Sequence, residues 1–377
     1  MIKVNEFYSL LKENEIDFFT GVPDSLLKSF CAYIKDNTPD THNVTAANEG
    51  NALGLAAGYH LATNKIALVY MQNSGLGNIV NPLTSLTDSL VYSIPALIMV
   101  GWRGEPGKKD EPQHIKQGQV TLELLDTLGI SYTILSKEST NSEAKAALAK
   151  AMEYMKNNSE PYAIVIKKDT FENYVLKTDI KTSFELTREE AIKIIVESLE
   201  KEDVIVSTTG MASRELFELR EQLKEGHEKD FLTVGSMGHS SQIALGISIA
   251  KPNRNVYCLD GDGALIMHMG ALTTVGSISP KNYKHIIINN GAHDSVGGQP
   301  TVGLNIDIEA IAKASGYTEA LCAETKEEVY EMINKIKSIE GPALLQIKVN
   351  KGARNDLGRP TTTPIQNKEA FMKFLSR

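Results

Sequence analysis

Hydrophobic positions along the chain follow two alternating patterns. Short, nearly continuous apolar runs, which are typical of buried strands, alternate with stretches in which apolar residues recur every three or four positions, which is typical of helices. In the first half the predicted strands are Asp17–Thr20, Asn43–Thr45, Ile66–Met71, Ala96–Val100, Tyr132–Leu135 and Ala163–Lys167, and the predicted helices are Ser25–Lys35, Asn51–Ala62 and Ser142–Asn157. In the second half the predicted strands are Val204–Ser207, Phe231–Val234, Val256–Leu259, His285–Asn289 and Leu344–Val349, and the predicted helices are Arg188–Leu199, Ser241–Ala250, Met267–Gly276 and Lys326–Ser338. This alternation predicts an α/β protein in which helices cover both faces of parallel sheets.

A short internal repeat indicates how these elements are divided. Glu160–Lys167 and Gly341–Lys348 both follow a helical pattern, contain a proline that stops the helix and continue as an apolar strand. The match is short enough to arise by chance, but it favours two similar halves. We therefore expect two doubly wound parallel-sheet domains, residues 1–170 and 187–377, joined by a polar linker over residues 171–186.

Composition and charge narrow the possible partners. The net charge of −8 comes without a basic stripe, so we expect no nucleic-acid partner. No apolar run approaches the roughly 18 residues of a membrane span, and the first residues lack a secretory pattern. Three scattered cysteines, Cys31, Cys258 and Cys322, form no C-x-x-C pair and lie in apolar surroundings, which predicts buried thiols in a cytoplasmic protein. An acidic protein that handles an anionic substrate must concentrate positive charge locally.

Two polar clusters, each at the end of a predicted strand, carry the strongest chemical signal. The first is Leu259–Ala264, with the sequence Leu-Asp-Gly-Asp-Gly-Ala, and the second is Ile287–Gly291, with the sequence Ile-Ile-Asn-Asn-Gly. Open parallel sheets bind ligands at the carboxyl ends of their strands. Gly261 and Gly263 allow the backbone to approach phosphate oxygens closely, and amides that open a helix at Ala264 can donate to those oxygens.

The same clusters supply metal ligands. Asp262 and Asn290 offer hard oxygen atoms that suit Mg²⁺, and diphosphate oxygens and water would complete an octahedron. Each cluster alone is typical of a turn, but the pair, with a strand before each, predicts a diphosphate and magnesium site. The pair resembles the fingerprint of thiamine-diphosphate-dependent enzymes, and the resemblance implies Asp262, Asn290 and the backbone carbonyl of Ala292 as metal ligands.

The resemblance implies further cofactor-binding residues. Glu49 follows a predicted strand and opens a small-residue helix, and it is similar to the glutamate that activates the cofactor; the alternative is a charge that only favours the helix N-terminus. Met237 resembles the bulky residue that bends the cofactor, with a core methionine as the alternative, and the carbonyl of Gly235 would accept from the cofactor's amino group. Gly210 lies at a strand-to-helix turn near the expected diphosphate, where a plain turn residue is the alternative.

The chain as a whole resembles the phosphonopyruvate decarboxylase family, from Gly21–Asp24 to Gly358–Pro360. The resemblance implies a pyrimidine-binding domain followed by a diphosphate-binding domain, without the middle domain of larger relatives. The resemblance implies decarboxylation of 3-phosphonopyruvate to phosphonoacetaldehyde and CO₂ in phosphonate biosynthesis, with thiamine diphosphate and Mg²⁺, in a homo-oligomer whose active sites lie between subunits. The sulfopyruvate decarboxylase family is the first alternative, and a non-catalytic cofactor-binding subunit is the second.

A multiply anionic substrate requires cations and hydrogen-bond donors. Arg103 and Lys109, in Gly101–His114, are the predicted cations, and a solvated charged loop is the alternative. The loop Ala292–Thr301 follows the metal cluster, and its residues His293 and Ser295 are further substrate candidates.

Some related decarboxylases carry histidines where this chain has Gln72-Asn73-Ser74-Gly75. Asn73 can orient a carbonyl group but cannot move protons at neutral pH. His114, His293, Asp24 and the cofactor's amino group therefore remain open as sources of the proton that completes the reaction.

Overall fold

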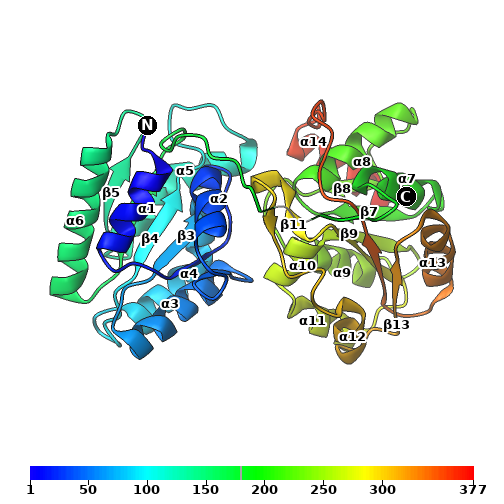
Figure 1. The fold of residues 1–377 in the computed structure, drawn as a ribbon. Helices are drawn as coiled ribbons and strands as arrows, with labels where there is room; N and C mark the ends of the chain where they lie inside the picture. Colours follow the sequence, from blue (N-terminus) through cyan, green and yellow to red (C-terminus); the bar gives the residue numbers. More distant parts are fainter. Residues whose placement is uncertain (179–180) are drawn as a thin grey trace. The chain divides into compact units, whose positions relative to one another are not determined.

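Each half of the chain is built around its own six-stranded parallel sheet (Figure 1). The computed structural model describes residues 1–178 and 181–377, and the chain divides into a first unit, Met1–Asp179, and a second unit, Ile180–Arg377. Residues 179 and 180, which belong to the predicted linker 171–186, lie outside the described residues. The predicted fold class, two α/β halves with parallel sheets, is confirmed.

The central strands of the first unit are buried on both faces, whereas the edge strands, β2 (Asn43–Thr45) and β5 (Ser131–Leu135), are partly exposed. The central strands are β1 (Phe19–Gly21), β3 (Leu68–Gln72), β4 (Leu97–Gly101) and β6 (Tyr162–Ile166). All strand pairs are parallel, in the order β2-β1-β3-β4-β6-β5. On the central strand β4, Leu97 and Met99 pack into one core while Ile98 and Val100 pack into the other. Burial of both faces explains why this strand reads as a continuous apolar run.

Helices form a layer on each face of this sheet. They are α1 (Val4–Glu13), α2 (Lys28–Asn37), α3 (Glu49–Thr63), α4 (Leu76–Pro82), α5 (Pro112–Thr127) and α6 (Asn141–Asn158), with two short turns, η1 (Asn73–Gly75) and η2 (Leu83–Thr87). Side chains of α1, α2 and α6 fill one core, and those of α3, α4 and α5 fill the other. Phe171 packs into the first of these cores, with its ring centroid 5.4 Å from that of Phe7. The beginning of the predicted linker therefore belongs to the first unit.

The sheet of the second unit contains the reversal in strand order that creates a ligand site. Its strands are β7 (Val204–Ser207), β8 (Asp230–Leu232), β9 (Val256–Gly261), β10 (Tyr283–Asn289), β13 (Glu319–Ala323) and β14 (Ala343–Lys348), and a separate antiparallel ribbon pairs β11 (Ala292–His293) with β12 (Gln299–Pro300). The order is β13-β14-β10-β9-β7-β8. After β7 the chain goes first to β8 on one side and then to β9 on the other. Doubly wound sheets bind ligands beyond the carboxyl ends of the strands at such a reversal.

Helices also cover both faces of the second sheet. They are α7 (Arg188–Glu197), α8 (Met211–Gln222), α9 (Ser240–Ala250), α10 (Asp262–Met267), α11 (Ala271–Ile278), α12 (Ile308–Ala314), α13 (Lys326–Ser338) and α14 (Pro364–Leu375), with the short turn η3 (Asp294–Val296). Side chains of α7, α8 and α13 pack on one face, and those of α9, α10, α11, α12 and α14 on the other. Among the described helices, none combines the length and the apolar character that a membrane crossing requires.

The internal repeat corresponds to equivalent strands. It lies on β6 and β14, and each of these is next to one edge of its sheet. When the strands of each sheet are counted in chain order, without the β11–β12 ribbon, both sheets have the order 2-1-3-4-6-5. The two halves thus share one topology, as the repeat indicated.

Four details differ from the sequence prediction. The single helix predicted over Met267–Gly276 is wrong, because α10 ends at Met267 and α11 begins only at Ala271. The edge strand β13 was not predicted. The predicted charged loop Gly101–His114 ends earlier than expected, because α5 begins at Pro112. Of the three thiols, that of Cys322 is only partly buried.

Candidate active site

A cavity of about 100 Å³ lies at the carboxyl ends of β7, β9 and β10. Strands β9 and β10 are paired in register, with Ile288 opposite Gly261, so the two predicted polar clusters end at the same edge of the sheet. The residues that line the cavity are Arg188, Thr208, Thr209, Met211, Ala212, Met237, Asp260, Gly261, Asp262, Gly263, Ala264, Ile288, Asn290, Ala292, His293, Asp294 and Ser295. Tertiary structure thus joins the Gly-Asp-Gly and Asn-Asn-Gly motifs in one site.

Asp262 and Asn290, the two predicted side-chain metal ligands, are both buried in this cavity. The Asp262 carboxylate accepts a short hydrogen bond from the hydroxyl of Thr301. The amide oxygen of Asn290 accepts from the backbone N–H of Ala292 at 3.0 Å. Ala292 lines the cavity too, so the three residues of the predicted ligand set share one site.

The charge of the cavity fits a divalent cation. Asp260, Asp262 and Asp294 line it, and Arg188 is the only lysine or arginine among the described residues that do so. Burial raises the pKa of Asp262 to about 6, although the hydrogen bond from Thr301 opposes this shift. A buried carboxylate without a cation is costly, and a donor set made only of oxygen atoms suits Mg²⁺.

Glycines leave room for a ligand beside this donor set. A Cβ built on Gly261 would meet no other atom within 4 Å, so the space next to its backbone is open. Gly263 has the opposite surroundings, because a Cβ there would lie 2.7 Å from the imidazole ring of His293. Gly210 has a φ of +94° and immediately precedes α8, and a Cβ on it would lie 3.8 Å from the hydroxyl of Ser295. Of the three predicted glycines, Gly261 therefore borders open space where a diphosphate can approach the backbone, whereas Gly263 lies against His293.

Met237 is presented to the cavity by a tight turn. The residues on either side, Ser236 and Gly238, have φ values of 54° and 83°. Met237 is half-buried and lines the cavity, and its methyl carbon would lie 3.3 Å from a Cβ on Gly263. Gly235 is not among the described residues that line the cavity. The position of Met237 differs from that of an ordinary core methionine and agrees with a residue that supports a bound cofactor.

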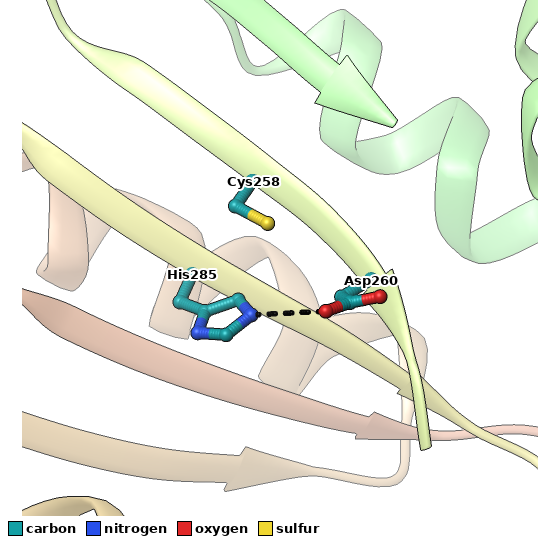
Figure 2. A group of neighbouring side chains, drawn as sticks. All are labelled: Cys258, Asp260 and His285. Atoms are coloured by element: carbon teal, nitrogen blue, oxygen red, sulfur yellow. Dashed lines mark ion pairs between the residues drawn. The ribbon is translucent and has the colours of Figure 1, made fainter. Parts of the chain in front are cut away.

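A buried cluster of three residues lies beneath the Gly-Asp-Gly turn. Figure 2 shows Cys258 and Asp260 on β9 and His285 on the neighbouring strand β10, all on one face of the sheet. The Nε2 atom of His285 lies 3.6 Å from a carboxylate oxygen of Asp260, and Nδ1 of His285 lies 3.0 Å from the hydroxyl of Tyr317. The other oxygen of Asp260 accepts from the backbone N–H of Gly261 at 3.0 Å. The sulfur of Cys258, a carboxylate oxygen of Asp260 and a ring nitrogen of His285 are close enough together to hold a metal ion. The hydrogen bond from Gly261 gives Asp260 a structural role instead, because it links this side chain to the turn before Asp262.

Asp294 connects the cavity to the surrounding structure. One of its carboxylate oxygens accepts from the side-chain amide of Asn290 at 2.7 Å, from Arg188 at 2.8 Å and from the backbone N–H of Gly352 at 3.1 Å. Arg188 also forms a bidentate ion pair with Glu215, with distances of 2.7 and 2.9 Å. These bonds fix the amide plane of Asn290, so they fix the direction of the oxygen that is predicted to ligate the metal.

His293 is half-buried, and its imidazole ring lies against Gly263. Burial lowers the pKa of His293 to about 4, and the nearby charge of Asp294 opposes this shift only in part. Its imidazole is therefore neutral at neutral pH, when it can accept or donate a hydrogen bond but cannot act as a cation. The predicted substrate residue Ser295 follows in the same loop and lines the same cavity.

In the first unit, Glu49 is the first residue of α3, as predicted, and only 5% of it is exposed. Its Oε2 atom accepts from the side-chain amide of Asn78 at 2.6 Å, and its carboxylate lies against Gly75. The helix is capped by Asn48, whose side chain accepts from Asn51. A buried, oriented carboxylate beside a separate capping residue is more than a charge that favours a helix N-terminus.

Asp24 and Asn73 lie near the carboxyl ends of β1 and β3. Asp24 is fully buried and accepts from the side-chain amide of Gln72 at 2.7 Å, and burial raises its pKa despite this bond. The amide group of Asn73 donates to the carbonyl of Arg103 and to the hydroxyl of Thr121, both at 2.8 Å, and its oxygen accepts from the N–H of Arg103 at 3.2 Å. These bonds use the polar atoms of Asn73 within the first unit, so its role here is structural and not the predicted orientation of a substrate carbonyl.

Arg103 is not the free cation that the sequence suggested. Its guanidinium forms a bidentate ion pair with Asp110, with 2.8 Å between Nε and one carboxylate oxygen, and also donates to the hydroxyl of Ser25 at 2.7 Å. Burial opposes the shift, but the bonds from Arg103 and the backbone hold the pKa of Asp110 well below its usual range. Lys109 is exposed, and His114 lies in the first turn of α5.

Several residues of the site were not predicted. Asn78, Asp294 and Thr301 each bind a predicted site residue through a side-chain hydrogen bond, and Arg188 is paired with Asp294. Asp294 and Thr301 lie in the loop that follows the metal cluster, so their proximity could be expected. Asn78 and Arg188 occupy ordinary helical positions, and no pattern in the sequence distinguishes them.

Comparison with known proteins supports the cofactor assignment in both units. Residues 4–121 match the model of the thiamine pyrophosphate enzyme N-terminal TPP binding domain, and residues 208–347 match that of the C-terminal TPP binding domain. The chain is 32% identical to a phosphonopyruvate decarboxylase of Streptomyces viridochromogenes, covering 94% of this chain and 90% of the relative. A phosphonopyruvate decarboxylase of Streptomyces hygroscopicus is 30% identical, over 99% of this chain and 94% of the relative.

A third relative carries a different substrate in its name. A sulfopyruvate decarboxylase of Methanosarcina acetivorans is 28% identical, over 97% of this chain and 95% of the relative. The matches extend over nearly the whole chain and include both the buried glutamate and the oxygen-lined cavity. The chain therefore belongs to the family of thiamine-diphosphate-dependent decarboxylases that act on small 2-oxo acids of the phosphonopyruvate and sulfopyruvate type.

Proposed function

We propose that this enzyme decarboxylates 3-phosphonopyruvate to phosphonoacetaldehyde and CO₂, with thiamine diphosphate and Mg²⁺ as cofactors. The observation that carries the proposal is the near full-length similarity to two relatives named phosphonopyruvate decarboxylase. The product fits a step in phosphonate biosynthesis, where irreversible loss of CO₂ draws an unfavourable phosphonate-forming reaction forward.

The second unit would hold the charged end of the cofactor. Asp262, Asn290 and the carbonyl of Ala292 are the groups that would ligate Mg²⁺, and Asp294 keeps the amide of Asn290 in the required orientation. The open side of Gly261 lets the backbone approach the diphosphate. Mg²⁺ offsets the negative charge of the cavity, which would otherwise repel a diphosphate.

The first unit would activate the cofactor. Thiamine diphosphate, when bound, supplies an electron sink for the electron pair that decarboxylation releases. Glu49 would accept a hydrogen bond from a ring nitrogen of the cofactor's pyrimidine and stabilise the protonated ring. Asn78 holds Oε2 of the same carboxylate, so Glu49 does not have to be reoriented when the cofactor binds.

Two of the residues predicted as proton sources differ in their ability to hold a proton at neutral pH. Burial lowers the pKa of His293, so its imidazole carries only one ring proton and is a poor acid. Burial raises the pKa of Asp24, which favours the protonated carboxyl group. We therefore propose Asp24, His114 or the cofactor's amino group, and not His293, as the source of the proton that completes the reaction.

We further propose that the enzyme is a homo-oligomer with active sites between subunits. Glu49 and the metal residues belong to different units of the chain, each with its own core. The first unit also exposes large apolar side chains, with Leu61 on α3 73% exposed and Leu90 and Tyr92 94% and 68% exposed. Large apolar side chains that are exposed in this way fit the proposed association of subunits.

Sulfopyruvate is the second candidate substrate, and the near full-length similarity to a sulfopyruvate decarboxylase favours it. A phosphonate dianion and a sulfonate monoanion differ in charge at the same end of a three-carbon 2-oxo acid. The test is kcat/KM for both acids with the purified holoenzyme, together with identification of the aldehyde. A kcat/KM at least tenfold higher for phosphonopyruvate supports the proposal, whereas a preference for sulfopyruvate would replace it.

A further inference from the structure

The segment that follows β14 is held firmly against the cofactor site. The side chain of Asn350 forms hydrogen bonds with the backbone of Phe184 at 3.0 and 2.6 Å, and the N–H of Lys351 donates to Thr182 at 3.2 Å. The N–H of Gly352 donates to Asp294, the residue that orients Asn290. Because β14 is the neighbour of β10 in a parallel sheet, this segment lies at the same edge as the metal residues.

The side chain of Lys351 lies on the loop that lines the cavity. A Cβ built on Gly298 would be 2.8 Å from Cε and 3.0 Å from Nζ of Lys351. Gly297 and Gly298 have φ values of 109° and 71°, a backbone conformation that other residues rarely adopt. The two glycines thus bring the loop backbone close to the half-buried lysine.

Lys351 differs from the other cations near the site because no carboxylate of the described residues neutralises its charge. Arg188 is paired with Glu215 and Asp294, and Arg354 is paired with Glu189 and other carboxylates. In the described residues, 1–178 and 181–377, the Lys351 ammonium has neither an ion pair nor a hydrogen bond. A partly desolvated ammonium without a partner is the local positive charge that an acidic protein needs for an anionic substrate.

We propose that Lys351 binds the distal acid group, phosphonate or sulfonate, of the 2-oxo acid substrate. The assignment rests on the proposed function and replaces Arg103, which Asp110 already neutralises. The loop that Lys351 contacts begins at Ala292, a predicted metal ligand, and contributes Ser295 to the cavity. Lysine acts as a point charge and accepts either tetrahedral anion, which suits a family that contains both phosphonopyruvate and sulfopyruvate decarboxylases.

The first test compares K351M, K351R and a charge-matched control, K348M, as holoenzymes. Lys348 lies three positions earlier and is paired with Glu324 at 2.7 Å, so K348M removes one positive charge without touching the loop. We expect K351M to raise KM for the preferred acid by about 10-fold to 100-fold. For pyruvate, which has no distal acid group, kcat/KM should change less than threefold, and K351R should recover part of the loss. The proposal would be overturned if K351M lost kcat/KM equally for the preferred acid and for pyruvate, or if its KM for the preferred acid were unchanged.

The second test does not depend on turnover. Phosphonoacetate and sulfoacetate carry the carboxylate and the distal acid group without a keto group, and isothermal titration measures their binding to the holoenzyme. K351M should bind both at least tenfold more weakly than the parent and K348M do. If the parent decarboxylates neither acid but this difference is found, the proposed function fails and the role of Lys351 stands. If parent and K351M bind the probes equally, Lys351 is not the anion site whatever the enzyme's substrate.

Discussion

The carboxylate of Glu49 and the side-chain amide of Asn78 are joined by a hydrogen bond of 2.6 Å between Oε2 and Nδ2. The two residues come from different helices, α3 and α4, which pack on the same face of the first sheet. A Cβ on Gly75 would lie 2.5 Å from Oε1, so only a glycine at this position leaves space for the carboxylate. One buried carboxylate is thus held from two sides, which pre-organises it to bind a cofactor.

Replacing Glu49 by glutamine should suppress catalysis while leaving the cofactor bound. The amide is similar in size but cannot stabilise a protonated pyrimidine ring, so we expect kcat to fall by about 100-fold or more. The dissociation constant of thiamine diphosphate, measured by quenching of protein fluorescence, should change less than fivefold. N78A is the comparison variant, and it should lower kcat less than E49Q because the carboxylate remains. A nearly normal kcat in E49Q would rule out the role assigned to Glu49.

Replacing Asp262 by alanine should weaken magnesium-dependent cofactor binding. The variant loses a buried anionic oxygen ligand, so the dissociation constant of thiamine diphosphate at fixed Mg²⁺ should rise by about 100-fold or more. This is a larger effect than the loss of a residue that only hydrogen-bonds to a metal ligand usually has. Circular dichroism and thermal unfolding of the metal-free proteins would show that the fold is preserved. An unchanged dissociation constant would place the metal elsewhere.

Cofactor binding should also depend on pH through Asp262. Burial raises the pKa of this carboxyl to about 6, so below that pH a cation must displace a proton before it can bind. The apparent affinity for Mg²⁺ and thiamine diphosphate should therefore be highest above pH 7 and fall as the pH decreases through 6. D262N keeps an oxygen ligand that does not titrate, and its affinity should depend less on pH. Parallel pH profiles for the two proteins would mean that another group, such as the diphosphate, causes the effect.

Mixing two inactive variants tests whether active sites are shared between subunits. E49Q damages the first unit and D262A the second, so a mixed dimer with shared sites contains one intact site. Random exchange should restore about a quarter of the parental activity, because half of the dimers are mixed and half of their sites are intact. Native mass spectrometry of differently tagged chains verifies the exchange. Verified exchange without recovered activity would contradict sites built from two chains.

Replacing Arg103 should affect stability more than substrate preference. R103A leaves the partly buried carboxylate of Asp110 without its partner, which should cost about 1–3 kcal/mol in the free energy of unfolding. The kcat/KM values for phosphonopyruvate and pyruvate should fall by similar factors, and D110N in the R103A background should recover part of the stability. A selective loss for phosphonopyruvate would return Arg103 to the substrate site as the sequence first suggested.

Local sequence patterns were sufficient to predict most strands of the two sheets and the cofactor-binding motifs. Val204–Ser207 and Lys326–Ser338 were predicted with the bounds that the structure gives them, because an apolar run and a Thr-x-x-Glu capping box are local signals. The edge strand β13 was missed because an edge strand has less apolar surface to bury than a central one. The break between α10 and α11 was missed because the apolar periodicity continues across it.

The sequence by itself determined the two parallel sheets, the order of their domains and the residues that meet at the carboxyl edges of their strands. These features depend on periodicity and on strand direction, which can be read within one segment. Only the tertiary structure decided which charges are free. Arg103 and Lys351 are both cations in polar segments, but a carboxylate seven residues away neutralises Arg103, while no carboxylate of the described residues reaches Lys351. Charge pairing depends on distances between side chains, and those distances exist only after the chain has folded.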